Sequence, residues 1–172
     1  MHAAGFKSFF RDIKQSVVAA AVLLAWDGAI NASFLMSYLS CPIWFLVSIV
    51  KNAIERPGWK LALVRIGIPA LTFWLVRVNS DFQLRVAEAN ARRVVAACED
   101  YHAANGRFPE KLDELVPQYL NSVPLAKYCL GPPSSYFYNS SASGSTLLCW
   151  QVIPPYYRKI YNFETRSWSY LD

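Results

Sequence analysis

The best candidate for catalytic chemistry in this chain is a cysteine followed four residues later by a histidine, Cys98 and His102. On a helix these positions share a face, and a thiol beside an imidazole is the arrangement of an activated nucleophile. Such a nucleophile also needs a third group that orients the base, and the neighbouring residues offer none. The sequence has no Gly-rich phosphate loop and no GxSxG or HExxH motif. We therefore predict that the protein is not an enzyme and uses no cofactor.

A second pair of cysteines, Cys129 and Cys149, lies in the part of the chain where strands are predicted. In an oxidising compartment the two can form a disulfide that closes a loop of about 20 residues and stabilises the fold by about 3 kcal/mol. In the alternative interpretation both stay unpaired and are buried as small apolar residues. Because the chain has only two histidines and no CxxC motif, a zinc site is not expected.

The elements that position these residues divide into a membrane half and a soluble half. Of the 172 residues, 54% are hydrophobic and only 17% are charged, whereas soluble domains carry about 25% charged residues. The deficit is local, because Val17 to Val50 contains one charged residue and Leu61 to Val78 contains two. We predict N-terminal membrane segments with an interfacial helix and a basic loop over 1–60, a transmembrane helix over 61–78, and a soluble domain over 79–172.

The first apolar run, Val17 to Val50, is too long for one helix and short for two complete crossings. The sequence offers two breaks in it, Asp27-Gly28 and Cys41-Pro42. In one interpretation a helix runs from about Val17 to Tyr38, and an interfacial segment follows over Ile43 to Ile54. In the other, the chain turns at Asp27-Gly28 and forms a shallow re-entrant hairpin.

Asp27 is the only acidic residue inside this run. A charge in lipid is costly and often marks a functional site. We expect a structural role, in which Asp27 pairs with Arg65 of the next apolar run or caps a helix after a break. Ion or proton conduction would need a chain of such groups, and the membrane segments contain no second carboxylate.

Basic residues flank the apolar runs and indicate how the chain is oriented. The N-terminal flank and the 51–60 loop are both positive, and positive flanks mark the cytoplasmic side. If both are cytoplasmic, the helix over 61–78 carries the soluble domain into the periplasm of a bacterial inner membrane, which is the arrangement we favour. If the first run crosses only once, the domain shares a side with the N-terminus. The charge is dispersed along the chain, so nucleic acid is not an expected partner.

The soluble half has the pattern of an α+β domain. Between Asp81 and His102 apolar residues repeat at helical spacing, and Asn105-Gly106 followed by Pro109 ends this helix. A second short helix is predicted over Glu110 to Tyr119. Two hairpins follow, so we predict an antiparallel sheet packed on the long helix, with strands at about 135–138, 146–152, 157–163 and 166–170.

The end of the long helix carries a resemblance to a known family. The stretch Tyr101 to Pro109 (YHAANGRFP) resembles the start of the globular region in the major pseudopilin of type II secretion and related pilin-like proteins, as do Leu112, Leu115, Val116-Pro117, Tyr119-Leu120 and Pro124. The resemblance implies a pilin-like head, in which the helix that leaves the membrane is a spine and a sheet packs against it. The pilin processing site is not matched, because Phe10 stands where the family has Glu. Cleavage and polymerisation into a pilus are therefore not expected.

The predicted C-terminal strands combine many aromatic residues with a few cations, which is typical of a protein-binding surface. In the alternative interpretation these aromatics only fill the packed side of the sheet. We predict a partner surface formed by Trp150, Tyr156, Tyr157, Arg158, Tyr161 and Trp168.

These features together predict an inner-membrane protein that contacts lipid and binds another protein through its pilin-like head. One hypothesis is an immunity protein that neutralises a membrane-targeting secreted toxin. The alternative is an accessory component of a type II secretion or type IV pilus-like assembly. A thiol-dependent enzyme built on Cys98 and His102 is the third and least supported class.

Overall fold

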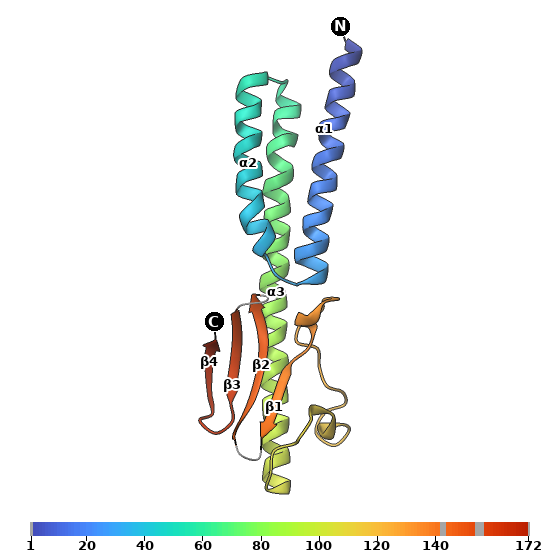
Figure 1. Cartoon of the computed structure of the whole chain (residues 1–172). Coiled ribbons are helices and arrows are strands. Elements are labelled where there is room, and N and C mark those ends of the chain that lie inside the picture. The colour runs from blue at the N-terminus through green and yellow to red at the C-terminus, as the bar shows by residue number, and fades with distance from the viewer. Residues whose placement is uncertain (1, 142–143, 154–156, 172) are drawn as a thin grey trace. The chain divides into compact units, whose positions relative to one another are not determined.

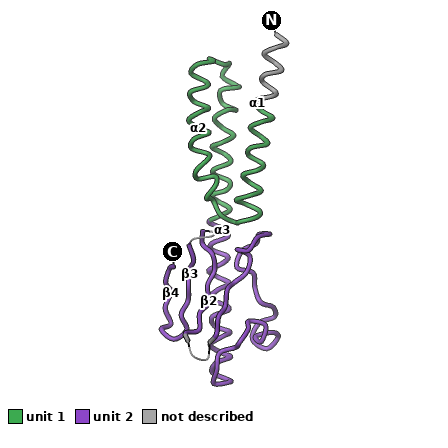
Figure 2. The backbone as a smooth tube through the Cα atoms, viewed as in Figure 1, with its two compact units in different colours: residues 1–80 green, residues 81–172 purple. Residues whose placement is uncertain are grey.

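The chain divides into two compact units. The computed structural model describes residues 2–141, 144–153 and 157–171. Unit 1 comprises residues 1–80 and unit 2 comprises residues 81–172, as Figure 2 shows. The long helix α3 (Trp59–Asn105) begins in unit 1 and ends in unit 2.

Unit 1 consists of apolar helices that run in alternating directions (Figure 1). Among the described residues, three helices are long and apolar enough to cross a membrane, judged by length and composition. The first candidate span, Ile13–Ile30, combines the end of an α-helix with a π-helical stretch. The elements of this unit are α1 (His2–Leu23), the π-helix η1 (Leu24–Ile30), α2 (Leu35–Glu55) and the first part of α3.

The break in the first apolar run lies at residues 31–34, later than Asp27-Gly28. The helix expected from about Val17 to Tyr38 is therefore wrong, because the chain leaves helical geometry before α2 begins. Ala32 has a φ of 45°, in the left-handed region that ends helices. At this helix end the carbonyl oxygen of Trp26 accepts from the backbone nitrogen of Asn31 at 3.0 Å and from its Nδ2 at 3.2 Å.

Cys41-Pro42, the other expected break, is not one. Pro42 lies inside α2, which continues through it to Glu55. The segment over 43–54 that was expected to be interfacial is the second half of this helix, and Leu35–Glu55 is itself a candidate membrane span. The apolar run thus supplies two helices long enough to cross, because the first of them begins well before Val17.

Unit 2 combines the last part of α3 with a four-stranded antiparallel sheet (Figure 1). Each strand pairs with the next one along the chain, so the strand order is β1-β2-β3-β4. The predicted α+β class and the antiparallel meander are confirmed at this level. The strands are β1 (Phe137–Ser141), β2 (Gly144–Ile153), β3 (Tyr157–Asn162) and β4 (Ser167–Leu171).

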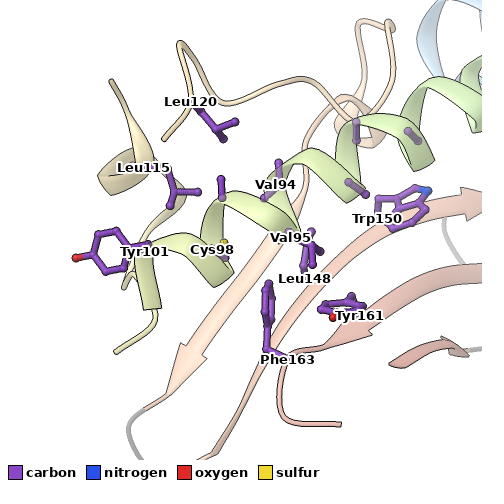
Figure 3. Packing of buried hydrophobic residues seen from close by; sticks show 14 residues of the cluster. Val94, Val95, Cys98, Tyr101, Leu115, Leu120, Leu148, Trp150, Tyr161 and Phe163 are labelled. Atoms are coloured by element: carbon purple, nitrogen blue, oxygen red, sulfur yellow. The ribbon is translucent and has the colours of Figure 1, made fainter. Parts of the chain in front are cut away.

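The core of unit 2 sets small residues on α3 against large residues on the sheet. Ala87, Ala91 and Cys98 are fully buried on the helix. Small side chains at these positions leave space beside the helix that large side chains must fill, because interiors are packed to crystal-like density. The large side chains that fill the space come from β2, β3 and the turn after β3, namely Leu148, Trp150, Tyr161 and Phe163 (Figure 3).

The segment between α3 and the sheet packs on another side of the same helix. Figure 3 shows Leu115, from this segment, across the helix from the strand residues. Polar side chains of α3 fasten the segment further along. Gln83 Nε2 donates to the carbonyl oxygen of Tyr128 at 3.1 Å, and Tyr128 N donates back to Gln83 Oε1 at 2.8 Å. Asn90 Nδ2 donates to the carbonyl oxygen of Leu125 at 2.9 Å.

The second helix predicted over Glu110 to Tyr119 is only one 3₁₀ turn, η2 (Leu112–Leu115). The physical reason is Pro117. A proline pushes the residue before it out of the helical region, and Val116 is accordingly extended, with φ −97° and ψ 137°. Apolar spacing alone suggested a longer helix, but the proline leaves room for a single turn.

Candidate functional site

The predicted partner surface is only partly at the surface. Trp150 and Tyr161 are 1% and 6% exposed, so their assignment to a partner surface is corrected: both belong to the core. Trp168 is half-buried and packs against the same core. Tyr156 lies outside the described residues. Only Tyr157 and Arg158 remain, both half-buried on β3.

Sheet register is the reason for this division. Trp150 pairs with Lys159, and Tyr161 pairs with both Leu148 and Trp168, so these side chains share one face of the sheet. That face packs on α3, where Tyr161 Oη donates to a carboxylate oxygen of the helix. Composition showed that the strands were aromatic but not which aromatics share this face. Tyr170 shares it as well, and is nevertheless exposed because it lies on the edge strand.

A lysine that was not predicted as a site residue, Lys159, lies among the aromatics of this face. Its ammonium is 5.7 Å from the ring centre of Trp150, 5.5 Å from that of Trp168 and 5.6 Å from that of Tyr170. Cations at such distances are attracted by the ring faces. The same nitrogen donates to Glu88 Oε1 on α3 at 3.2 Å. The lysine therefore fixes these three rings on the sheet and links them to the helix.

Glu88 receives a second cation from its own helix. Arg92 Nη2 donates to the same carboxylate oxygen at 3.0 Å. These hydrogen bonds, that from Arg92 first and that from Lys159 second, hold the pKa of the Glu88 carboxyl below its usual value. The pairing with Arg92 follows from the four-residue spacing on a helix. The contact with Lys159, 71 residues further along, has no signal in the sequence.

The exposed apolar residues on the last strand are the best remaining candidates for partner binding. Tyr170 is 56% exposed and Leu171 is 53% exposed. The ring of Tyr157 stacks on that of Tyr170, with centroids 5.2 Å apart and planes at 16°. Arg158 pairs with Leu171 across β3 and β4, on the opposite face of the sheet from Tyr157 and Tyr170. We call these four residues, which flank β4 on its two faces, the β4 surface.

The turn after α3, where the pilin-like residues cluster, depends on one carboxylate. Glu114 Oε2 accepts from Tyr101 Oη at 2.7 Å and from Arg107 Nη2 at 3.4 Å. Its other oxygen, Oε1, accepts from the backbone nitrogens of Glu110 at 2.7 Å and Lys111 at 3.1 Å. The hydrogen bond from Tyr101 is the first cause that holds the pKa of Glu114 below its usual value. In the sequence Glu114 is one of three acidic residues with Glu110 and Asp113, and the pattern does not distinguish it from the other two.

The cysteines are all thiols in the structure. Cys129 and Cys149 are both free, so the predicted disulfide is not formed in it. Burial raises the pKa of both thiols. Cys98 is fully buried, and burial raises its pKa to about 12, so it carries almost no thiolate at neutral pH. His102 is exposed and stacks on Phe108, with ring centroids 4.3 Å apart.

The predicted pair of Asp27 and Arg65 is also corrected, in favour of the capping alternative. Asp27 is 1% exposed, and its Oδ2 accepts from the backbone nitrogen of Ser37 at 2.6 Å. Its Oδ1 accepts from that of Met36 at 3.3 Å. These two backbone N–H groups lie in the first turn of α2, where a helix offers them no acceptor of its own. Arg65 instead has its Nη1 2.7 Å from a carboxylate oxygen of Glu55.

No protein-family model, no curated protein and no solved structure matches this chain. The likeness to pilin-like proteins therefore stays a prediction, carried by the residues from Tyr101 to Pro124. Within the described part of the chain, no three His, Cys, Asp or Glu side chains gather closely enough to hold a metal ion.

We expect Asp27→Ala to destabilise unit 1, because it leaves two donors at the start of α2 without their acceptor. Loss of such a cap costs about 0.5–2 kcal/mol. Asp27→Asn keeps a side-chain carbonyl that can accept one of the bonds, so its loss should be smaller. Thermal unfolding of the full chain in detergent checks this. The account of Asp27 is contradicted if Asp27→Ala melts at the wild-type temperature.

The turn around Glu114 predicts an acid-sensitive unit 2. The folded pKa of Glu114 lies below its ordinary value of 4.5, so its contribution is present above that pH and is lost as the pH falls through the folded pKa. Wild type should therefore lose more stability than Glu114→Gln when the pH is lowered from about 6 to about 3. Denaturant unfolding at each pH measures this, with the exposed neighbour in Asp113→Asn as control. Equal losses in wild type and Glu114→Gln would contradict it.

Proposed function

We propose that the protein is a membrane-anchored binding protein without catalytic chemistry, and that its head, unit 2, binds a protein partner. One observation carries the proposal. Trp150, Tyr161 and Trp168 on the same sheet face are covered wholly or in part by the core, whereas Tyr170 is exposed on the last strand of the sheet. Tyrosine and arginine are the residue types enriched at binding hot spots.

The β4 surface suits a partner in two ways. β4 pairs with β3 on one side only, so its other edge is available to an added strand, as in peptide recognition by β-augmentation. The side chains beside that edge are already ordered. Tyr157 stacks on Tyr170, and Lys159 lies against the Tyr170 ring. A pre-ordered aromatic loses little side-chain entropy when a partner covers it.

The membrane arrangement supports a head outside the cytoplasm. Three crossings, one for each candidate span, would put the head on the opposite side of the membrane from the N-terminus. The positive N-terminal flank and the positive segment 51–60, where α2 ends and α3 begins, would both lie in the cytoplasm, as the charge rule favours. In a bacterial inner membrane the head would then be periplasmic.

Within this class we propose an immunity protein that neutralises a membrane-targeting toxin. A small head with a binding edge, held at the membrane, is suited to intercept such a toxin where it acts. The proposal that the chain is not an enzyme is supported by Cys98, whose buried thiol has a pKa of about 12. An accessory role in a secretion or pilus-like assembly is the alternative, and the continuous helix α3 favours it, since a pilin-like spine has this form.

We expect Tyr170→Ala to reduce recovery of the native partner about tenfold, which corresponds to about 1.4 kcal/mol of binding free energy. Tyr128→Ala is a matched control, because Tyr128 is 58% exposed and Tyr170 is 56% exposed. Each full-length variant is cross-linked in native membranes, purified in detergent and analysed by quantitative mass spectrometry.

A toxin-like partner that is lost in Tyr170→Ala and kept in Tyr128→Ala supports the immunity role. Secretion or pilus components with the same pattern support the accessory role instead. Partner proteins that are recovered equally with wild type and both variants would contradict the β4 surface as the binding site.

A further inference from the structure

The net charge of the chain comes from two segments of the sequence of unit 1. Residues 1–16 and 51–65 contain seven basic residues and two acidic ones, which accounts for the whole net charge of +5. The two segments meet in space, because residues of both line one cavity between α1, α2 and α3. The basic residues are Lys7, Arg11, Lys14, Lys51, Arg56, Lys60 and Arg65, and the acidic ones are Asp12 and Glu55.

The cavity is polar although it lies among apolar helices. Its volume is about 280 Å³. By contrast, the grooves between α1 and α2 and between α2 and α3 nearer the other end of these helices are lined almost wholly by apolar side chains. A polar hollow among membrane helices needs water or a polar ligand to satisfy its groups. The polar and aromatic groups that line it are Gln15, Ser16, Trp44, Ser48, Lys51 and Arg65.

The guanidinium in this cavity is held in place. Arg65 is 8% exposed, and its Nη1 contacts Glu55 at 2.7 Å and Asn52 Oδ1 at 3.5 Å. Asn52 is itself fixed, because its Nδ2 donates to the carbonyl oxygen of Ala62 at 3.2 Å. Lys51 lies on the wall of the same cavity. The site therefore presents an oriented guanidinium and an ammonium together.

This combination fits a phosphate. Arg presents planar donors that match phosphate oxygens, Lys adds a point charge, and serine hydroxyls can donate further hydrogen bonds. Basic pockets between transmembrane helices on the cytoplasmic side bind the headgroups of anionic lipids. Trp44 at the cavity is the residue type that anchors helices at the lipid headgroup level.

We propose that this cavity binds the phosphate of an anionic phospholipid headgroup. Membrane lipid rather than free phosphate is the source, because each helix that lines the cavity carries a candidate membrane span. A bound headgroup would contact all three helices of unit 1 at once. Anionic lipid would thus stabilise the three packed helices of unit 1 by a specific contact, in addition to surrounding them as solvent.

The test measures thermal stability of the full-length protein in detergent with added phosphatidylglycerol or phosphatidylcholine. Phosphatidylglycerol should raise the unfolding temperature, and phosphatidylcholine should not. Lys51→Gln should weaken the apparent affinity for phosphatidylglycerol at least fivefold. Lys60→Gln is the matched control, because Lys60 is an exposed lysine of the same basic segment that does not line the cavity. Lys51 is also exposed, so its loss should leave the fold intact.

Three outcomes would overturn the proposal. Equal stabilisation by the two lipids would show no selectivity for an anionic headgroup. Equal weakening in Lys51→Gln and Lys60→Gln would show attraction to the basic surface as a whole. Equal stabilisation by inorganic phosphate alone would show a phosphate site whose ligand is not a lipid.

Discussion

The fold of unit 2 depends on a stripe of small residues along the last part of α3. Ala87, Ala91 and Cys98 are fully buried, and their small side chains leave room at the helix for large side chains of the sheet. Tyr136, just before β1, donates from its Oη to the carbonyl oxygen of Ala87 at 2.6 Å. The bulk that fills the core comes from the sheet, with Trp150 as its largest fully buried side chain. Because the aromatics are committed to this contact, little of the aromatic sequence remains for binding.

The helix and the strands of unit 2 could be predicted from the sequence, but the packing between them could not. Periodicity gave the helix from Asp81 to His102 and the order of the strands, because both depend on residues near in the chain. It could not give the function of each aromatic. Trp150 and Tyr170 both lie opposite Lys159 on one sheet face, but Trp150 is buried in the core and Tyr170 is exposed on the edge strand. Periodicity also missed Glu114 and Lys159, whose partners are set by tertiary contacts with Tyr101 and Glu88.

Unit 1 follows the rule that polar groups among apolar helices must be satisfied within the protein. Asp27 was the most conspicuous residue of this half, and the sequence left open whether it pairs with a cation or caps a helix. In the structure Asp27 is a cap, because the break at residues 31–34 places the first turn of α2 next to its carboxylate. Arg65 was the expected cation, but its Nη1 lies 2.7 Å from a carboxylate oxygen of Glu55. Neither contact follows from composition or spacing.

The central claim is that three crossings hold a binding head on the side of the membrane opposite to the N-terminus. Reporter fusions test it most directly, with an enzyme that is active only outside the cytoplasm placed either after Asp172 or in the turn at Gly58, between α2 and α3. The account predicts activity for the fusion after Asp172 and none for the fusion at Gly58. Activity at Gly58 together with inactivity after Asp172, or the same result at both positions, would contradict it.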